Sequence, residues 1–185
     1  VAHATSLVKS ALEAGITLFD TADIYGPDNG EGFGASEALL GQVFAADPGL
    51  RGQMVLATKG GIRMGVPYDS SSAYIDEAVD ASLQRLGVDH VDLWQIHRPD
   101  LLAHPAEVAE ALDRIVSSGR ARAVGVSNFT PAQVAALTSY LETPLASIQP
   151  EFSALASKPL FDGTMDQAMQ MGLAVLAWSP LGQGR

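Results

Sequence analysis

The chain has 185 residues, of which 47% are hydrophobic and 17% are charged. This composition can bury a core and excludes a disordered chain. Acidic residues number 21 against 11 basic ones, and the resulting net charge of −10 argues against a nucleic-acid partner. Cysteine is absent, which excludes disulfides, zinc knuckles and thiol nucleophiles. No apolar run reaches the ~18 residues of a membrane span and no signal peptide opens the chain, so we expect a cytoplasmic protein without a membrane partner.

Short apolar segments alternate with longer amphipathic segments along the whole chain. The apolar segments predict strands at 16–20, 53–59, 91–97, 122–127, 145–149 and 174–178. The amphipathic segments predict helices at 3–14, 34–45, 72–86, 105–118, 131–141 and 163–171. Most of the strands are apolar at consecutive positions, which is typical of a parallel sheet that is covered on both faces.

This alternation predicts either a doubly wound sheet or a closed (β/α)8 barrel. In a doubly wound sheet, ligand-binding residues gather at the strands that flank the switch point. In a barrel, every strand can deliver a functional residue at its carboxyl end. All six predicted strands end in polar or aromatic residues, namely Asp20, Lys59, His97, Ser127-Asn128, Gln149 and Trp178-Ser179. The pattern therefore favours an α/β protein of the (β/α)8 TIM-barrel class.

The barrel that this sequence displays is incomplete. A (β/α)8 barrel closes with eight strands, usually over ~250 residues. The chain opens on a predicted helix and stops shortly after its sixth predicted strand. We therefore interpret residues 1–185 as a single barrel domain in which strands 2 to 7 are visible, and which lacks its first strand and its C-terminal portion.

Lys59 is the most informative single residue. It ends an apolar strand and is one of only three lysines in the chain. An ammonium group beside the core needs a carboxylate or a chemical role. Lys59 can be a Schiff-base nucleophile, a group that tunes a neighbour, or a rim lysine that reaches out to water. Asp20 ends its own strand in the same way, so the two side chains can form an ion pair across the rim.

Tyr25 and His97 are the candidate proton donors. Tyr25 follows Asp20 by five residues, in a loop at the predicted barrel mouth, where a tyrosine can also simply cover the core edge. A nearby ammonium would lower its pKa from the usual ~10 and make the phenol a usable acid. His97 is notable for its position at a strand end. No HExxH-type spacing occurs, so we expect no metal site.

Three further strand ends carry groups suited to a ligand. The hydroxyl and amide groups of Ser127, Asn128 and Gln149 can match a carboxamide, although Asn128 can equally cap the next helix. Trp178 can stack on a ring or pack at the rim. The segment SPLGQG offers backbone N–H groups to a pyrophosphate. No GxGxxG follows a strand, so a Rossmann site is excluded.

The motifs GITLFDTADIYG, LATKGG, DLWQIHRPD, GVSNF, QPEFS and AWSPLGQG occur in this order. The ordered set resembles the aldo-keto reductases of the bacterial type, and the resemblance extends over essentially the whole chain. It implies a (β/α)8 enzyme that reduces an aldehyde or ketone by hydride transfer from NAD(P)H. It also implies a small-molecule carbonyl substrate and a monomer or weak oligomer. The preference for NADPH over NADH comes from this resemblance alone.

The resemblance also implies roles for individual residues. Tyr25 would be the general acid, Lys59 held by Asp20 would tune it and relay protons, and His97 would orient the carbonyl. The nicotinamide carboxamide would lie against Ser127, Asn128 and Gln149. Trp178 would replace the tyrosine that usually stacks on the ring. The pyrophosphate would approach Ser179, Pro180, Leu181, Gly182 and Gly184.

Two alternative functions stay open at this point. One is a barrel aldolase that uses Lys59 as its Schiff base. The other is a nucleotide-binding regulatory subunit of the same fold with little turnover. Trapping of substrate on Lys59 would support the aldolase, whereas repeated turnover of NADPH with simple aldehydes would support the reductase.

Overall fold

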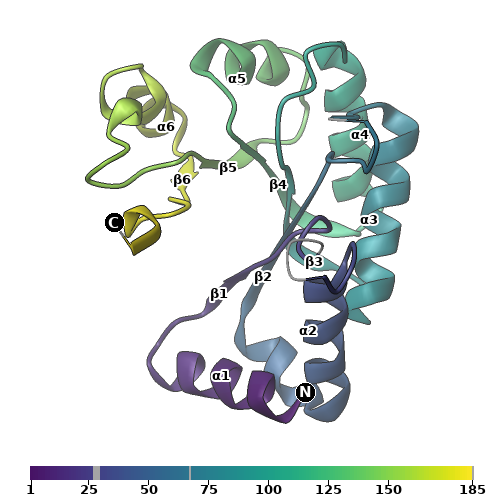
Figure 1. Ribbon diagram of the computed structural model, residues 1–185. Helices are drawn as coiled ribbons and strands as arrows, with labels where there is room; N and C mark the ends of the chain where they lie inside the picture. The colour runs from purple at the N-terminus through teal and green to yellow at the C-terminus, as the bar shows by residue number, and fades with distance from the viewer. Residues whose placement is uncertain (27–29, 67, 185) are drawn as a thin grey trace.

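A computed structural model of the protein describes residues 1–26, 30–66 and 68–184. Six strands form one sheet, and every neighbouring pair is parallel. Their spatial order follows the sequence, β1-β2-β3-β4-β5-β6. A doubly wound sheet reverses its order at a switch point, whereas a barrel adds each strand beside the previous one. The sheet curls as part of a barrel (Figure 1), so the predicted fold class is confirmed.

The strands lie close to their predicted positions. They are β1 (Leu18–Asp20), β2 (Val55–Gly60), β3 (Val91–Ile96), β4 (Ala121–Ser127), β5 (Leu145–Gln149) and β6 (Ala174–Val175). The last strand is shorter than predicted. Its continuation forms an isolated bridge between Glu151 and Trp178, and the chain then turns at Ser179, which adopts a positive φ of 50°.

The helices also match the predicted pattern. They are α1 (Ala2–Glu13), α2 (Ala35–Ala46), α3 (Ser72–Leu86), α4 (Pro105–Ser117), α5 (Pro131–Thr138) and α6 (Thr164–Met171). Three 3₁₀ helices, which the sequence pattern did not predict, cover Pro48–Gln53, Lys158–Leu160 and Gly182–Gly184. Helix α5 ends at Thr138, before the predicted position 141, and the hydroxyl groups of Thr138 and of the C-cap Ser139 donate to carbonyls of its last turns. Within the described ranges, no helix has the length and apolar character that crossing a membrane requires.

The register of the strands separates two chemically different faces of the sheet. Lys59, Gln95, Gly125 and Ser147 are successive partners across β2 to β5. Side chains alternate along a strand, so residues two positions away share that face. Strand-end residues Asp20, Ser127 and Gln149 therefore lie on the same polar face, the interior of a barrel. The opposite face is apolar and packs on the helices through Leu56, Trp94, Ile96, Val124, Val126 and Ile148.

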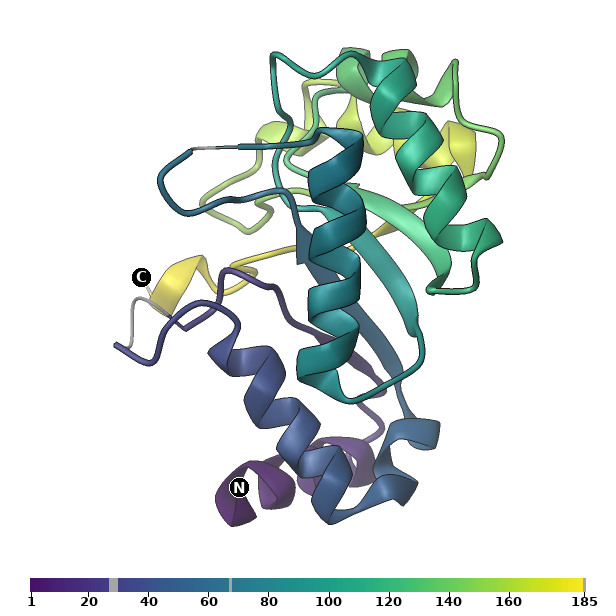
Figure 2. The same cartoon turned by 90° about the vertical axis from the view of Figure 1, so that its right-hand side faces the viewer.

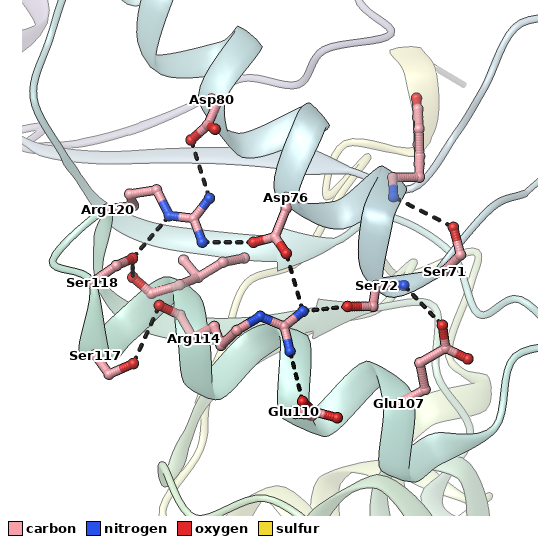
Figure 3. Close-up of polar contacts among 12 residues, drawn as sticks. Ser71, Ser72, Asp76, Asp80, Glu107, Glu110, Arg114, Ser117, Ser118 and Arg120 are labelled. Carbon is pink, nitrogen blue, oxygen red and sulfur yellow. Dashed lines mark hydrogen bonds and ion pairs between the residues drawn. The ribbon is translucent and has the colours of Figure 1, made fainter.

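Helices α2, α3 and α4 lie side by side on the outer face (Figure 2). An ion-pair network ties α3 to α4 and to the start of β4 (Figure 3). Asp76 of α3 accepts from Arg114 at 3.0 Å and from Arg120 at 2.6 Å, and Asp80 pairs with Arg120 at 3.1 Å. Single exposed ion pairs add little stability, but a carboxylate shared by two arginines fixes the geometry of both. The network therefore aligns α4 and β4 on α3.

The contact between α2 and α3 is unusually close and contains a buried charge. Glu37 of α2 is fully buried, accepts from the Thr58 hydroxyl, and pairs with Arg85 Nε at 2.7 Å. Four residues further along α2, a Cβ atom on Gly41 would lie 2.3 Å from the backbone oxygen of Arg85. Only glycine allows the two helix backbones to approach this closely.

Asp23 is a second buried carboxyl group on this outer side of the sheet. Its exposed fraction is 1%, and neither carboxylate oxygen has a hydrogen bond of regular geometry within the described residues. Burial raises the pKa of Asp23 to about 7, and the charge of Glu37 adds to this effect. Arg85, the Ile24 backbone and Lys59 oppose it. Asp23 therefore changes its protonation near neutral pH.

Replacing Gly41 by alanine should destabilise the protein although it improves helix propensity. The gain from removing a helix-interior glycine is about 1 kcal/mol. The added methyl group meets a backbone oxygen that cannot move away as a side chain would, and such overpacking costs ~1–3 kcal/mol. We expect a lower midpoint of urea unfolding for Gly41→Ala. The control is Gly52→Ala, where nothing lies within 4 Å of the new atom. An unchanged or raised midpoint for Gly41→Ala would contradict the close contact.

Asp23→Asn should stabilise the protein at alkaline pH but not in acid. Because the folded-state pKa is raised, the wild-type carboxyl group supports folding below pH ~4, and this support is lost as the pH rises through about 7. The amide stays neutral throughout. The difference in unfolding free energy should therefore grow by on the order of 2–4 kcal/mol between pH 4 and pH 7 and then stay constant. Urea unfolding at several pH values measures it, with the exposed Asp166→Asn as control. A difference independent of pH would show that Asp23 ionises normally.

Candidate active site at the carboxyl ends of the strands

Lys59 and Asp20 form the centre of the polar face. Lys59 Nζ lies 2.6 Å from Asp20 Oδ2 and donates to the backbone oxygen of Thr21 at 2.8 Å. The Lys59 side chain is 0% exposed, and that of Asp20 is 28% exposed. Burial lowers the pKa of Lys59, and the charge of Asp20 opposes that lowering. A rim lysine that reaches out to water is excluded by this burial, and the predicted ion pair is present.

Tyr25 and His97 lie beside this ion pair. The Tyr25 ring centroid is 5.2 Å from Lys59 Nζ and 5.8 Å from the His97 ring, which meets it edge-on at 85°. Tyr25 is 41% exposed, so its ring faces the open side of the site. The structure thus brings together four residues that the sequence singled out, delivered by β1, the following loop, and the ends of β2 and β3.

The pKa of Tyr25 is raised, and the prediction of a lowered value is wrong. Burial is the largest cause, and the negative charge of Asp20 is the second. Arg98 partly opposes them. The ammonium of Lys59 does not offset these effects: it is paired with Asp20, whose negative charge acts on the phenol itself. Tyr25 therefore holds its proton at neutral pH.

His97 is held in its neutral form. Burial lowers its pKa to about 3, and the positive charges of Lys59 and Arg98 add to this. Its backbone N–H donates to the Gly60 oxygen at 2.8 Å, which fixes the residue to the end of β2. Ring atom Nδ1 is buried and has no hydrogen-bond partner among the described residues. A neutral imidazole carries one N–H and one acceptor nitrogen, so it can donate a single hydrogen bond to an oxygen in the site.

Ser127, Asn128 and Gln149 form a connected row on the same rim. Ser127 Oγ donates to the Gln149 backbone oxygen at 2.9 Å, and Asn128 Nδ2 donates to Ser127 Oγ at 2.9 Å. Gln149 Nε2 reaches Asp20 Oδ2 at 3.2 Å and so joins this row to the central ion pair. Asn128 does not cap α5, because that helix has Thr130 as its N-cap with a capping box to Gln133.

Asn128 connects the row to the segment that follows β6. Its backbone takes a left-handed φ of 62°, a conformation that asparagine tolerates better than most residues. This turn lets Asn128 Nδ2 donate to the His97 backbone oxygen at 3.1 Å, while Asn128 Oδ1 accepts from Trp178 Nε1 at 3.0 Å. Trp178 is therefore held by its indole N–H at the edge of the site.

The remaining predicted residues lie beyond Trp178, on the other side of the sheet from α3 and α4 (Figure 1). Gly182 has a φ of 58° and lies against the Leu155 side chain. A Cβ atom at this position would be 3.0 Å from Leu155 Cδ1. Leu181 is exposed. The predicted pyrophosphate segment is Ser179, Pro180, Leu181, Gly182 and Gly184, and its role stays a prediction.

Sequence reasoning missed the polar layer beneath the site. Ser147 Oγ donates to Gln95 Oε1 at 3.1 Å, and both side chains are buried on the inner face. Gln95 interrupts the apolar run VDLWQIH, a signal that could have found it. The contact of Lys59 with the Thr21 carbonyl could not have been predicted in this way, because it involves a backbone atom and not a side chain.

Among the residues with described positions, no three His, Asp or Glu side chains gather where one metal ion could be held.

The sequence profile of the Aldo/keto reductase family matches residues 2–185. The 6-dehydroglucose reductase of Novosphingobium aromaticivorans is 59% identical over 184 residues, which cover 100% of this chain and 60% of that protein. The 6-dehydroglucose reductase of Agrobacterium fabrum is 40% identical over 192 residues, which cover 99% of this chain and 63% of that protein. The chain thus spans less than two thirds of the length of these curated relatives.

Solved structures show the same architecture. The glycerol dehydrogenase of Gluconobacter oxydans superposes with a TM-score of 0.85 at 34% identity, covering 97% of this chain and 54% of that one. The sequential parallel strands and the profile match extend over the same residues. The chain belongs to the aldo/keto reductase family.

Proposed function

We propose that the protein containing this chain reduces a small aldehyde or ketone to the alcohol, with a nicotinamide cofactor as hydride donor. One observation carries the proposal. A protonated phenol, a buried ammonium–carboxylate pair and a neutral imidazole converge on one rim of the sheet. Together these groups can give a proton and positive potential to a carbonyl oxygen that becomes negative. Membership of the family supports the same reaction class.

The proposed roles follow from the charge state of each group. A bound nicotinamide cofactor would supply the hydride for the carbonyl carbon. Tyr25 gives its proton to the carbonyl oxygen, and its raised pKa keeps that proton in place until the oxygen gains charge. Lys59, whose Nζ lies 5.2 Å from the centre of the phenol ring, returns a proton to the phenolate after the transfer. His97, neutral at physiological pH, donates a hydrogen bond that orients the carbonyl.

The residues of the rim fit a nicotinamide cofactor. A carboxamide has one acceptor oxygen and one donor NH₂, and a hydroxyl with two amides offers both kinds of partner. Ser127, Asn128 and Gln149 would hold this group, and Trp178 would stack on the ring. The backbone of 179–184 would approach the pyrophosphate. NADPH is the form that we propose, in line with the family resemblance.

The contacts of Lys59 disfavour an aldolase. A Schiff-base lysine must present a free, neutral amine to its substrate. Here Nζ donates to both Asp20 and the Thr21 carbonyl and is shielded from solvent. These two contacts hold Nζ inside the site, away from an incoming carbonyl carbon, which disfavours its use as a nucleophile. Two curated relatives are named 6-dehydroglucose reductases, which supports a polyhydroxylated aldehyde as the substrate.

Tyr25→Phe should lower turnover by at least ~10²-fold, the lower end for general acid catalysis, and leave the affinity for NADPH unchanged. The ring and its packing against His97 are kept, and only the transferable proton is lost. NADPH oxidation with glyceraldehyde measures turnover, and fluorescence titration measures cofactor affinity. Tyr140→Phe, at an exposed position, is the matched control. Near-normal turnover of Tyr25→Phe would remove the phenol from the mechanism.

The fluorescence of Trp178 should be quenched when NADP⁺ binds, because stacking places the two rings in contact. Trp94 is fully buried on the helix-facing side of the sheet and should not respond. We therefore expect Trp178→Phe to lose the quenching, with the emission of Trp94 retained as an internal control. Quenching that persists in Trp178→Phe would show that the indole does not stack on the cofactor.

A further inference from the structure

Arg98 differs from the other arginines that the structure describes. Each of the others lies within 4.0 Å of a carboxylate, as Arg51, Arg63, Arg85, Arg114, Arg120 and Arg122 show. Arg98 forms no ion pair with any carboxylate in the described part of the chain, although the protein carries 21 acidic residues. An unpaired guanidinium in so acidic a chain is available for a ligand.

The carboxylate that follows Arg98 most closely in sequence is occupied elsewhere. Asp100 Oδ2 accepts from the backbone N–H of Ser70 at 3.1 Å, and Oδ1 accepts from that of Leu102 at 2.9 Å. The bond from Ser70 holds the loop after β3 against the segment before α3, and the bond from Leu102 closes a turn within that loop. Asp100 therefore shapes the loop that carries Arg98 without forming an ion pair with the guanidinium.

Arg98 also lines a cavity beside the candidate active site. The cavity has a volume of about 420 Å³, within the ~300–1,000 Å³ typical of small-molecule sites. Its polar groups are Arg98, Asp100, Tyr68 and Asn128, and its apolar walls include Leu101 and Leu102. Asn128 bonds to the His97 backbone. Both His97 and Tyr25 feel the charge of Arg98. The cavity thus lies next to the candidate active site and shares Asn128 with it.

The chemistry of the guanidinium defines what the cavity takes. Arg98 presents N–H donors in a planar fork and has no acceptor, so it binds oxygen atoms. We infer that this cavity is the subsite for the part of the substrate remote from its carbonyl, and that Arg98 donates hydrogen bonds to hydroxyl or anionic oxygens there. The enzyme then selects oxygen-rich short aldehydes over alkyl aldehydes of the same length. This inference rests on the proposed carbonyl reductase function.

Three substrates with the same three-carbon skeleton test the subsite in the full-length enzyme. Propanal has no distal oxygen, glyceraldehyde has neutral hydroxyls, and glyceraldehyde 3-phosphate adds an anion. Arg98→Gln should lower kcat/KM for one or both oxygen-bearing substrates, relative to propanal, by roughly tenfold or more, the loss expected for a hydrogen bond to a charged donor. A loss with glyceraldehyde identifies hydroxyl oxygens as the ligand, and a loss confined to the phosphate identifies an anion.

The ratio of kcat/KM for an oxygen-bearing substrate to kcat/KM for propanal separates a loss of substrate recognition from a change in the pKa of the reacting groups. Arg98 also acts on the pKa of Tyr25 and His97, and any change there affects all three substrates equally. Arg98→Lys keeps the charge but loses the planar fork. Its kcat/KM for the oxygen-bearing substrates should fall relative to its kcat/KM for propanal. Arg122→Gln, at an exposed arginine of β4, is the control and should change neither the rate with propanal nor this ratio of kcat/KM values.

Two results would overturn the inference. Equal losses for all three substrates in Arg98→Gln would mean that the arginine only tunes the reacting groups, and no loss would mean that it faces no substrate. Failure of the parent enzyme to oxidise NADPH with any of the three aldehydes is a different result. It would overturn the proposed function, and the inference with it.

Discussion

A buried ammonium group is the constraint on which the rest of this site depends. Moving a charge out of water is costly unless a partner of opposite charge and further hydrogen bonds compensate it. Lys59 is shielded from solvent and is compensated by the Asp20 carboxylate and the Thr21 carbonyl. Both partners come from the neighbouring strand and the residue that follows it. The register between β1 and β2, in which Asp20 stands opposite Ala57, brings the carboxylate within 2.6 Å of the ammonium.

The alternation of side chains keeps two systems of charges apart. Asp20 and Lys59 lie on the inner face, where a ligand can reach them. Glu37 and Arg85 lie on the outer face, between sheet and helices, and Asp23 joins them there although it follows Asp20 by only three residues. Glu37 and Arg85 on the outer face connect α2 and α3 to the sheet, whereas Asp20 and Lys59 on the inner face form part of the candidate active site. A shift of one residue in register would exchange the two faces and destroy both systems.

Sequence reasoning recovered the strand ends because a polar residue after an apolar run is a local signal. Asp20, Lys59, His97 and Gln149 were all found in this way. It failed for the pKa of Tyr25, which depends on burial and on the pairing of Asp20 with Lys59 in space. It also gave no sign that Arg98 is unpaired, although Asp100 lies two residues away, because Asp100 accepts from the backbone of Leu102 in the same loop and from that of the distant Ser70. The pKa of Tyr25 and the unpaired state of Arg98 depend on which contacts their neighbours already make in space. The order of residues in the chain does not reveal such contacts.

The position of Trp178 has a mechanical consequence. Its indole N–H holds the Asn128 side chain, and the same side chain holds the backbone of His97. Two hydrogen bonds therefore link the segment after β6 to the end of β3, across strands that are not neighbours in the sheet. The side chain of Asn128 thus couples the segment after β6 directly to the backbone of His97. A displacement of that segment would act on the histidine through this side chain and not through the helix-facing core.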